Sequence, residues 1–236
     1  MSGVRLAEPD QAPLRGEHAA LRSRRRGLRG WRRELLLRWG VRLPQLAGLA
    51  ERLASALAGR EPQRVVRPEA RQAAVAVVVS LEDEPALIFI RRKVRRGDPW
   101  SGQMAFPGGF QAANGESLAT TAARETREET GLDLAACGRL LGVLDDLSPR
   151  TPFLPPIIVS PHVFAVGARE SLVAGDEAEE ALWIGARDVF DPKNRSTFLL
   201  VLREGERAFP SIQVGPHVIW GLTERILDRL ASLVTI

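Results

Sequence analysis

The stretch ESLATTAARETREETGL, residues 116–132, decides the fold that we expect for this chain. Residues 117–130 have the composition of a helix, and Gly131 is a typical residue to end one. Within such a helix Glu125, Glu128 and Glu129 are three and four residues apart, so their carboxylates share one face. Carboxylates that close repel one another, so stability alone does not account for the pattern.

Two interpretations of this face remain open from the spacing alone. A hard divalent cation such as Mg²⁺ or Mn²⁺ would remove the repulsion, because it takes carboxylate oxygens as ligands and keeps positions for water and substrate phosphates. Alternatively, Arg124 and Arg127 pair with the acids, and the segment is an ordinary salt-bridged surface helix.

The segments around the helix predict an α/β domain. The stretch before it, residues 95–116, is rich in glycine and proline and is expected to be a long functional loop. Strand-like segments that alternate with helical ones indicate a mixed sheet covered by helices. The predicted strands are residues 73–80, 86–90, 139–143, 157–166 and 181–184, and a closing helix is predicted over residues 222–233.

Together with its flanks, the helix resembles the signature of the Nudix hydrolase family, G-x5-E-x7-R-E-U-x-E-E-x-G-U, in which U is apolar. Two positions differ, since six residues rather than five separate Gly109 from Glu116, and Thr126 stands where an apolar residue is usual. The matching positions are Glu116, Arg124, Glu125, Glu128, Glu129, Gly131 and Leu132. The resemblance implies an α/β/α sandwich with a mixed sheet, and a metal-dependent enzyme that hydrolyses a diphosphate joined to another group.

The resemblance also implies roles for individual residues. Glu125, Glu128 and Glu129 would bind Mg²⁺ or Mn²⁺. A backbone carbonyl near Gly109 would be a further ligand. Glu125 and Glu128 would also act in catalysis, together with Arg124, which would orient a glutamate. The structural residues of the motif would be Gly108, Gly131 and Glu116, the last of which braces the loop against the helix.

The base that activates water is, in several members of the family, a separate acid on a later loop. The acidic run GDEAEE, residues 175–180, lies just before an apolar strand. We name Glu177 and Glu179 as candidate bases, because a carboxylate can accept the proton of an attacking water. A solvated acidic turn is the alternative interpretation for each of them.

Two further segments resemble the coenzyme A diphosphatase branch of this family, namely GQMAFPGG at residues 102–109 and WGLT at residues 220–223. This likeness implies CoA or a CoA derivative as substrate, with adenosine 3′,5′-bisphosphate and a phosphopantetheine as products. The upstream pattern of the branch differs here, because Asp98 and Trp100 replace an Arg and a His that are expected near the nucleotide phosphates. The candidate substrate contacts are Arg91, Arg92, Gln103, Phe106 and Trp100.

Other substrates and one other class of function stay open at this point. ADP-ribose, dinucleoside polyphosphates or damaged nucleotides would use the same chemistry. A non-catalytic domain that senses a nucleotide or binds nucleic acid is the alternative from another class, although carboxylates that repel phosphates do not suit a pure binder. For Phe106 and Trp100, packing within the loop competes with stacking on a base.

The charge of the chain is divided unevenly. The 236 residues carry a net charge of +4 with an isoelectric point near 10.3. Residues 1–42 hold eleven arginines against four acids, a balance of +7 that leaves −3 for the remainder. We interpret this arginine-rich leader as a solvated tail. Nucleic acid is therefore not an expected partner, and the four acids argue against a mitochondrial transit peptide.

The sequence predicts a division into two parts. Residues 1–66 would form a basic, partly helical N-terminal extension, and residues 67–236 the hydrolase domain. Residues 60–68 contain two prolines and are predicted to be a linker between them. The extension contains one apolar helical stripe made by Leu46, Leu49, Leu53 and Leu57.

Apolar run length and cysteine usage suggest where the protein acts. The longest apolar run, residues 73–79, has seven residues, whereas a membrane-spanning helix needs about 20. The single cysteine, Cys137, cannot form an intramolecular disulfide, so a reducing, cytoplasmic compartment is expected. The expected partner is a small nucleotide substrate, and a homodimer is compatible with the sequence.

Overall fold

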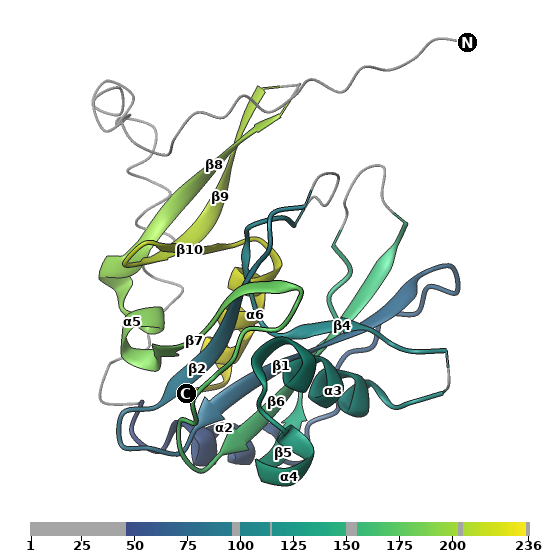
Figure 1. Ribbon diagram of the computed structural model, residues 1–236, viewed down its shortest axis with the longest axis vertical. Helices are drawn as coiled ribbons and strands as arrows, with labels where there is room; N and C mark the ends of the chain where they lie inside the picture. The colour runs from purple at the N-terminus through teal and green to yellow at the C-terminus, as the bar shows by residue number, and fades with distance from the viewer. Residues whose placement is uncertain (1–45, 96–99, 114, 150–154, 203–204, 235–236) are drawn as a thin grey trace. The chain divides into compact units, whose positions relative to one another are not determined.

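The computed structural model describes residues 46–95, 100–113, 115–149, 155–202 and 205–234 (Figure 1). The arginine-rich leader, Arg96 and Asp98 lie outside the described residues. Among the described residues, no helix is long and apolar enough to cross a membrane. The elements, in chain order, are α2 (Leu49–Leu57), β1 (Arg71–Ser80), β2 (Ala86–Arg92), β3 (Met104–Ala105), β4 (Gly108–Phe110), α3 (Leu118–Thr130), α4 (Leu134–Cys137), β5 (Gly138–Val143), β6 (Ile157–Val166), β7 (Ala178–Gly185), α5 (Ala186–Phe190), the 3₁₀ turn η3 (Pro192–Asn194), β8 (Arg195–Leu202), β9 (Gly205–Val214), β10 (His217–Trp220) and α6 (Leu222–Val234).

A seven-stranded mixed sheet forms the centre of the domain. Its main order is β3-β2-β1-β6-β5, with β4 paired to β1 and β7 paired to β2. Strands β1 and β6 run parallel over ten residue pairs, and the other pairings in this sheet are antiparallel. Both parallel strands are almost continuously buried, as expected for strands covered on both faces.

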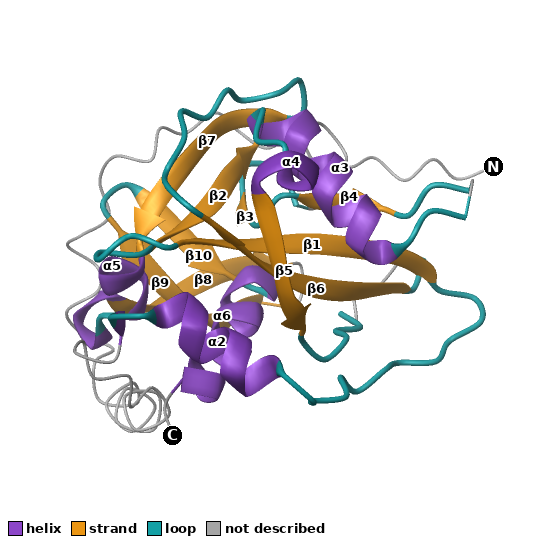
Figure 2. Ribbon diagram, turned by 90° about the horizontal axis from the view of Figure 1, so that it is seen from below, coloured by secondary structure: helices purple, strands orange, loops and turns teal. Residues whose placement is uncertain are grey.

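Alternating residues of β1 face two separate helical layers. Val77 and Val79 belong to the larger apolar cluster, which also holds the buried leucines of α2 and α6. Ala76 and Val78 belong to the smaller cluster, which includes Ala122 of α3. Figure 2 shows α3 and α4 on one side of β1 and β6, and α2 and α6 on the other. The predicted α/β/α sandwich with a mixed sheet is thereby confirmed.

A smaller three-stranded antiparallel sheet, in the order β10-β9-β8, precedes α6. Sequence patterns did not reveal this sheet. Trp220 of β10 stacks on Phe198 with ring centroids 4.2 Å apart, and Phe209 tilts against the same ring at 5.5 Å. Trp220 is therefore part of an aromatic cluster on this sheet.

The N-terminal helix is part of the domain, so the predicted boundary at residue 67 is wrong. Leu53 of α2 is fully buried in the main core. Arg52 Nη2 donates to the carbonyl of Val234 in α6 at 3.0 Å. The predicted linker is held as well, because the amides of Gln63 and Val65 donate to the carboxylates of Asp145 and Asp146. The stripe of leucines is buried only by packing against the rest of the domain, so the domain includes α2.

Candidate active site

The helix that carries the three glutamates has well-defined ends. Ser117 Oγ accepts a hydrogen bond from the Thr120 amide at 3.1 Å, a typical N-terminal cap. Gly131 adopts φ 76° and donates its amide to the Arg127 carbonyl, a typical C-terminal stop. Thr126, the departure from the family signature, is buried and donates its hydroxyl to the Ala122 carbonyl at 2.7 Å. A threonine is therefore tolerated here because its polar atom is satisfied within the helix.

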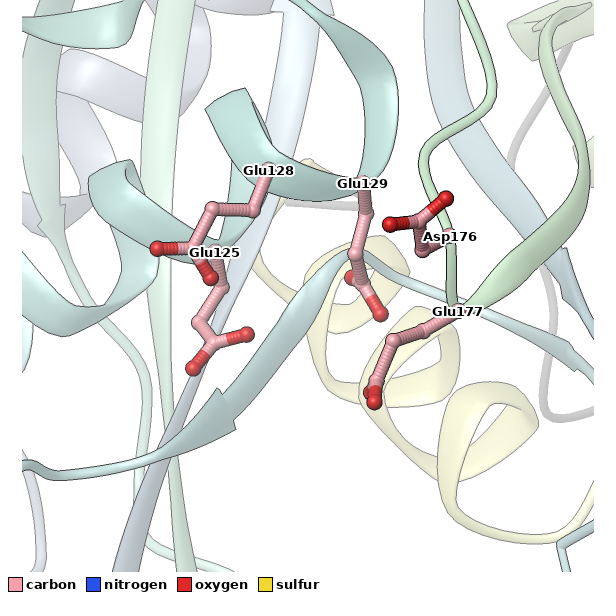
Figure 3. A pocket seen from close by; sticks show the side chains of 5 residues that line it. All are labelled: Glu125, Glu128, Glu129, Asp176 and Glu177. Carbon is pink, nitrogen blue, oxygen red and sulfur yellow. The ribbon is translucent and has the colours of Figure 1, made fainter.

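Five carboxylates line one pocket beside this helix (Figure 3). Helix α3 contributes Glu125, Glu128 and Glu129, as the spacing predicted, and the segment before β7 contributes Asp176 and Glu177. The pocket has a volume of about 460 Å³. Asp176 was not singled out as a site residue from the sequence, and its position within the run GDEAEE was the only signal for it.

The glycine pair before the helix lets β4 approach the site closely. A Cβ on Gly109 would lie 2.4 Å from the Glu125 carboxylate, and a Cβ on Gly108 would lie 2.4 Å from the Ala74 carbonyl. The Gly108 amide donates to Glu129 Oε2 at 2.9 Å. Gly108 is thus required by space, because a Cβ there would meet backbone, whereas a Cβ at Gly109 would displace the Glu125 carboxylate. The Gly109 carbonyl as a metal ligand stays a prediction.

Arg124 binds three of the glutamates at once. Its Nη2 lies 3.0 Å from Glu116 Oε1, and its Nη1 lies 2.8 Å from Glu125 Oε1 and 3.2 Å from Glu128 Oε2. Nη2 also donates to the Phe110 carbonyl at 3.3 Å. This guanidinium therefore connects α3 to the loop that precedes it and orients two of the pocket carboxylates.

Glu116 also joins this loop to α3. Its Oε1 accepts hydrogen bonds from the Ala112 amide and from the Thr121 hydroxyl, both at 3.0 Å. The hydrogen bonds from Arg124 and Ala112 lower the pKa of Glu116 to about 2. These contacts are those of a brace between loop and helix, which is the role that the resemblance implied.

Burial changes the acidity of the pocket glutamates. Glu129 is 2% exposed, and its desolvation raises its pKa to about 7. The Gly108 hydrogen bond and the charge of Arg92 oppose that rise, while the charge of Glu125 adds to it. Desolvation also raises the pKa of Glu125, against the lowering effect of Arg124. A cation in the pocket would lower the free energy of the charged forms of both groups.

The donor set suits a hard divalent cation, although the carboxylates are not gathered around one point. Among the described residues, no three acidic, histidine or cysteine side chains are placed closely enough to hold a metal ion as they stand. Repulsion and the pairing of Glu125 and Glu128 with Arg124 account for that spread. All five groups offer oxygen ligands, which Mg²⁺ and Mn²⁺ prefer.

The two candidate bases differ in their surroundings. Glu177 lines the pocket, and its Oε1 lies 3.0 Å from Arg95 Nη1. Glu179 lies on β7 and pairs with Arg91 at 3.3 Å, and it does not line the pocket. Arg91 also lies 3.5 Å from Glu180. The geometry favours Glu177 over Glu179, and it places Arg91 on the acids of β7.

The other predicted substrate contacts lie between the end of β2 and the start of β4. Phe106 is 3% exposed and stacks on Phe89 with centroids 4.9 Å apart. A ring buried in this way has no face for a base, so the structure favours the packing alternative for Phe106. Trp100 and Gln103 are partly exposed. The Gln103 carbonyl accepts from the Arg92 amide at 3.0 Å, which joins the loop to the end of β2.

A family model and one of the curated relatives indicate the same family. A family model described as the NUDIX domain matches residues 70–206, more than half of the chain. The Nudix hydrolase NudL of Yersinia pestis (strain Pestoides F) is 32% identical over 170 residues, which cover 70% of this chain and 81% of NudL. Protein C14C4.10c of Schizosaccharomyces pombe is 30% identical over 144 residues, which cover 52% of this chain. The chain spans less than half of that relative, 44% of its length.

One solved structure also aligns with part of this chain. The MutT/nudix family protein from Enterococcus faecalis aligns with a TM-score of 0.48 at 22% identity. The alignment covers 78% of this chain and 68% of the Enterococcus chain.

Proposed function

The chain belongs to the Nudix family, and on that premise we propose that it hydrolyses the diphosphate bond of a nucleotide derivative with the help of Mg²⁺ or Mn²⁺. The observation that carries this proposal is the pocket in which three glutamates of α3 meet Asp176 and Glu177. Five carboxylates around one cavity would repel a diphosphate, so the pocket suits an anionic substrate only when a cation is bound there. This argues against a non-catalytic binder.

The residues of the pocket have distinct roles in this proposal. The bound cation would offset the charge of the phosphate oxygens and make water more acidic. Glu177 would accept the proton of the attacking water, because it lines the pocket and its side chain is 56% exposed. Arg124 would hold Glu125 and Glu128 in place. Arg95, which faces Glu177, would contact a phosphate once the substrate is bound.

For the substrate we propose CoA or a CoA derivative, cleaved to adenosine 3′,5′-bisphosphate and a phosphopantetheine. The support is that the two segments resembling the CoA diphosphatase branch touch each other. Thr223 Oγ1, in the WGLT segment, donates to the carbonyl of Met104, in the GQMAFPGG segment, at 3.1 Å. Met104 itself pairs with Arg91 of β2. The two joined segments therefore lie beside the end of β2, which carries the candidate substrate contacts Arg91 and Arg92.

A substrate panel tests both levels of this proposal. Purified protein with Mg²⁺ is given CoA, an acyl-CoA, oxidised CoA, ADP-ribose, a dinucleoside tetraphosphate and an oxidised nucleoside triphosphate, and kcat/KM is measured for each. We expect the highest value for a CoA compound. Hydrolysis in ¹⁸O-water followed by mass spectrometry then identifies the phosphorus that is attacked. A clear preference for ADP-ribose rejects the CoA assignment, and no hydrolysis of any compound rejects the enzymatic function.

Variants of the helix test the mechanism. We expect Glu128→Gln and Glu129→Gln to lose at least about 100-fold in kcat, because each removes a charged oxygen ligand. Glu84→Gln is the matched control, since the Glu84 side chain is 80% exposed and lies 3.6 Å from Arg187 in an exposed ion pair. Normal turnover by both pocket variants would reject the mechanism, whereas loss in the control would indicate a general effect of charge.

A further inference from the structure

The segment before β7 rests on the C-terminal end of α3. The last carbonyls of a helix have no partner within the helix and need one elsewhere. Here the Val173 amide donates to the Thr130 carbonyl at 2.9 Å, and the Gly175 amide donates to the Glu129 carbonyl at 3.1 Å. We call this pair of hydrogen bonds the seam. It joins two segments that are distant in the sequence by backbone atoms alone.

Gly175 fits the seam because it lacks a side chain. A Cβ at this position would lie 1.9 Å from the Glu128 carbonyl oxygen and 3.2 Å from Glu129 Cα. Gly175 does not have a left-handed φ, so the need for glycine here comes from space and not from backbone conformation. The atom that a Cβ would meet belongs to the helix backbone, which cannot rotate away as a side chain would.

The seam lies between the two groups of carboxylates that make the pocket. Glu128 and Glu129 carry their side chains into the pocket from the helix side, and Asp176 and Glu177 follow Gly175 directly on the other side (Figure 3). The far end of the segment is also held, because the Lys93 amide donates to the Glu177 carbonyl at 3.0 Å. The path between the two groups of acids is therefore short and made of backbone.

We propose that Gly175 is a positioning residue of this enzyme, and that the seam sets the separation between the helix carboxylates and those of Asp176 and Glu177. The proposal rests on the proposed function, because it assigns the geometry of the same site. A cation that draws on both groups needs them at a fixed separation. A displacement of about 1 Å at a reacting centre can cost about 100-fold in rate.

A glycine substitution with a matched control tests the proposal. In Gly175→Ala the segment must retreat by about 1.5 Å for the 1.9 Å approach to reach an ordinary contact of 3.4 Å. Gly167→Ala is the control, since a Cβ there meets nothing within 4 Å and its φ is not left-handed. Mn²⁺ affinity is measured without substrate, from the signal of free Mn²⁺ in electron paramagnetic resonance. We expect Gly175→Ala to bind Mn²⁺ at least about tenfold more weakly and Gly167→Ala to bind it normally.

A double-mutant cycle separates positioning from general loss of structure. We expect Glu177→Gln to lower kcat strongly in the wild-type background and less than twofold in the Gly175→Ala background, because Glu177 is already displaced there. A folded Gly175→Ala protein with normal Mn²⁺ affinity and normal kcat overturns the proposal. A lower melting temperature with unchanged Mn²⁺ affinity also overturns it, since the seam would then be structural only.

The wild-type protein provides a second measurement in case Gly175→Ala does not fold. Amide hydrogen exchange of Val173 and Gly175 is followed by NMR with and without Mg²⁺. We expect both amides to exchange several-fold more slowly when Mg²⁺ is present, and no response to Mg²⁺ overturns the proposal. Because Mn²⁺ affinity and exchange need no substrate, a protein that hydrolyses nothing in the panel would refute the proposed function while these results still decide the role of the seam.

Discussion

Glu129 accepts a hydrogen bond from the Gly108 amide at 2.9 Å while its side chain is almost completely removed from water. The single hydrogen bond does not compensate for that desolvation, since the pKa of Glu129 rises to about 7. In the absence of a cation the buried carboxylate therefore costs free energy when it ionises. The site gives up stability for the capacity to bind a positive charge.

The first prediction concerns Glu129→Gln, which keeps the shape of the side chain and an acceptor for the Gly108 amide. A carboxyl whose pKa is raised in the folded state destabilises the protein as the pH rises from about 4.5 towards 7 and above. The penalty at pH 8 is on the order of 3 kcal/mol. We expect the variant, in EDTA, to melt about 5–10 °C above wild type at pH 8 and close to wild type at pH 5.

Thermal denaturation at the two pH values, with and without Mn²⁺, provides the measurement. Mn²⁺ should raise the melting temperature of the wild type more at pH 8 than at pH 5, because it competes with the proton on Glu129. The same rise should be absent or much smaller in Glu129→Gln. A stability difference that does not depend on pH would contradict the assignment of the raised pKa to this residue.

A second prediction concerns the brace at Glu116, whose pKa is lowered in the folded protein, whereas that of Glu129 is raised. Arg124 and the Ala112 amide lower its pKa to about 2. Its contribution to stability is present above the unfolded value near 4.5 and is lost as the pH falls towards 2. Glu116→Gln should therefore lower the melting temperature at pH 7 and have a smaller effect at pH 3. A difference that grows on acidification would contradict the ion pair with Arg124.

The features that could be predicted from the sequence are those that depend on residues close together in the chain. Glu125, Glu128 and Glu129 share one helix, so their spacing alone predicted a common face. Gly175 and Glu128 are 47 residues apart, and their contact depends on how β7 is brought to α3, which no local pattern reveals. Phe106 could not be assigned for a similar reason, since an aromatic residue in a glycine-rich loop has the same local pattern whether it packs or binds.

The N-terminal helix shows the same limit at the scale of the domain. The leucine stripe predicted a helix correctly, but its partner, α6, lies at the opposite end of the chain. Two prolines predicted a linker, whereas Asp145 and Asp146 bind the backbone of that segment and hold it against the domain. Composition indicates how a segment behaves when isolated. Here hydrogen bonds to residues distant in the sequence hold the segment against the domain.

A third prediction follows for Leu53, which is fully buried on α2. Leu53→Ala removes buried apolar volume and should cost about 2–5 kcal/mol, which lowers the melting temperature by roughly 5–15 °C. Ser55→Ala on the exposed side of the same helix is the control and should change stability by less than about 0.5 kcal/mol. Equal melting temperatures for the two variants would contradict the conclusion that α2 packs into the core of the domain.

The last prediction concerns Arg95, whose Nη1 lies 3.0 Å from Glu177 Oε1. Both side chains are at least half exposed, so this ion pair contributes at most about 1 kcal/mol and opens readily when an anionic substrate arrives. Arg95→Met should therefore leave the melting temperature unchanged and raise KM about tenfold, with a smaller change in kcat, because a phosphate contact is lost. Arg187→Met, at an exposed ion pair with Glu84, is the control for the loss of one positive charge. If Arg95→Met keeps its KM and lowers only kcat, then Arg95 acts by orienting Glu177 and not by binding the substrate.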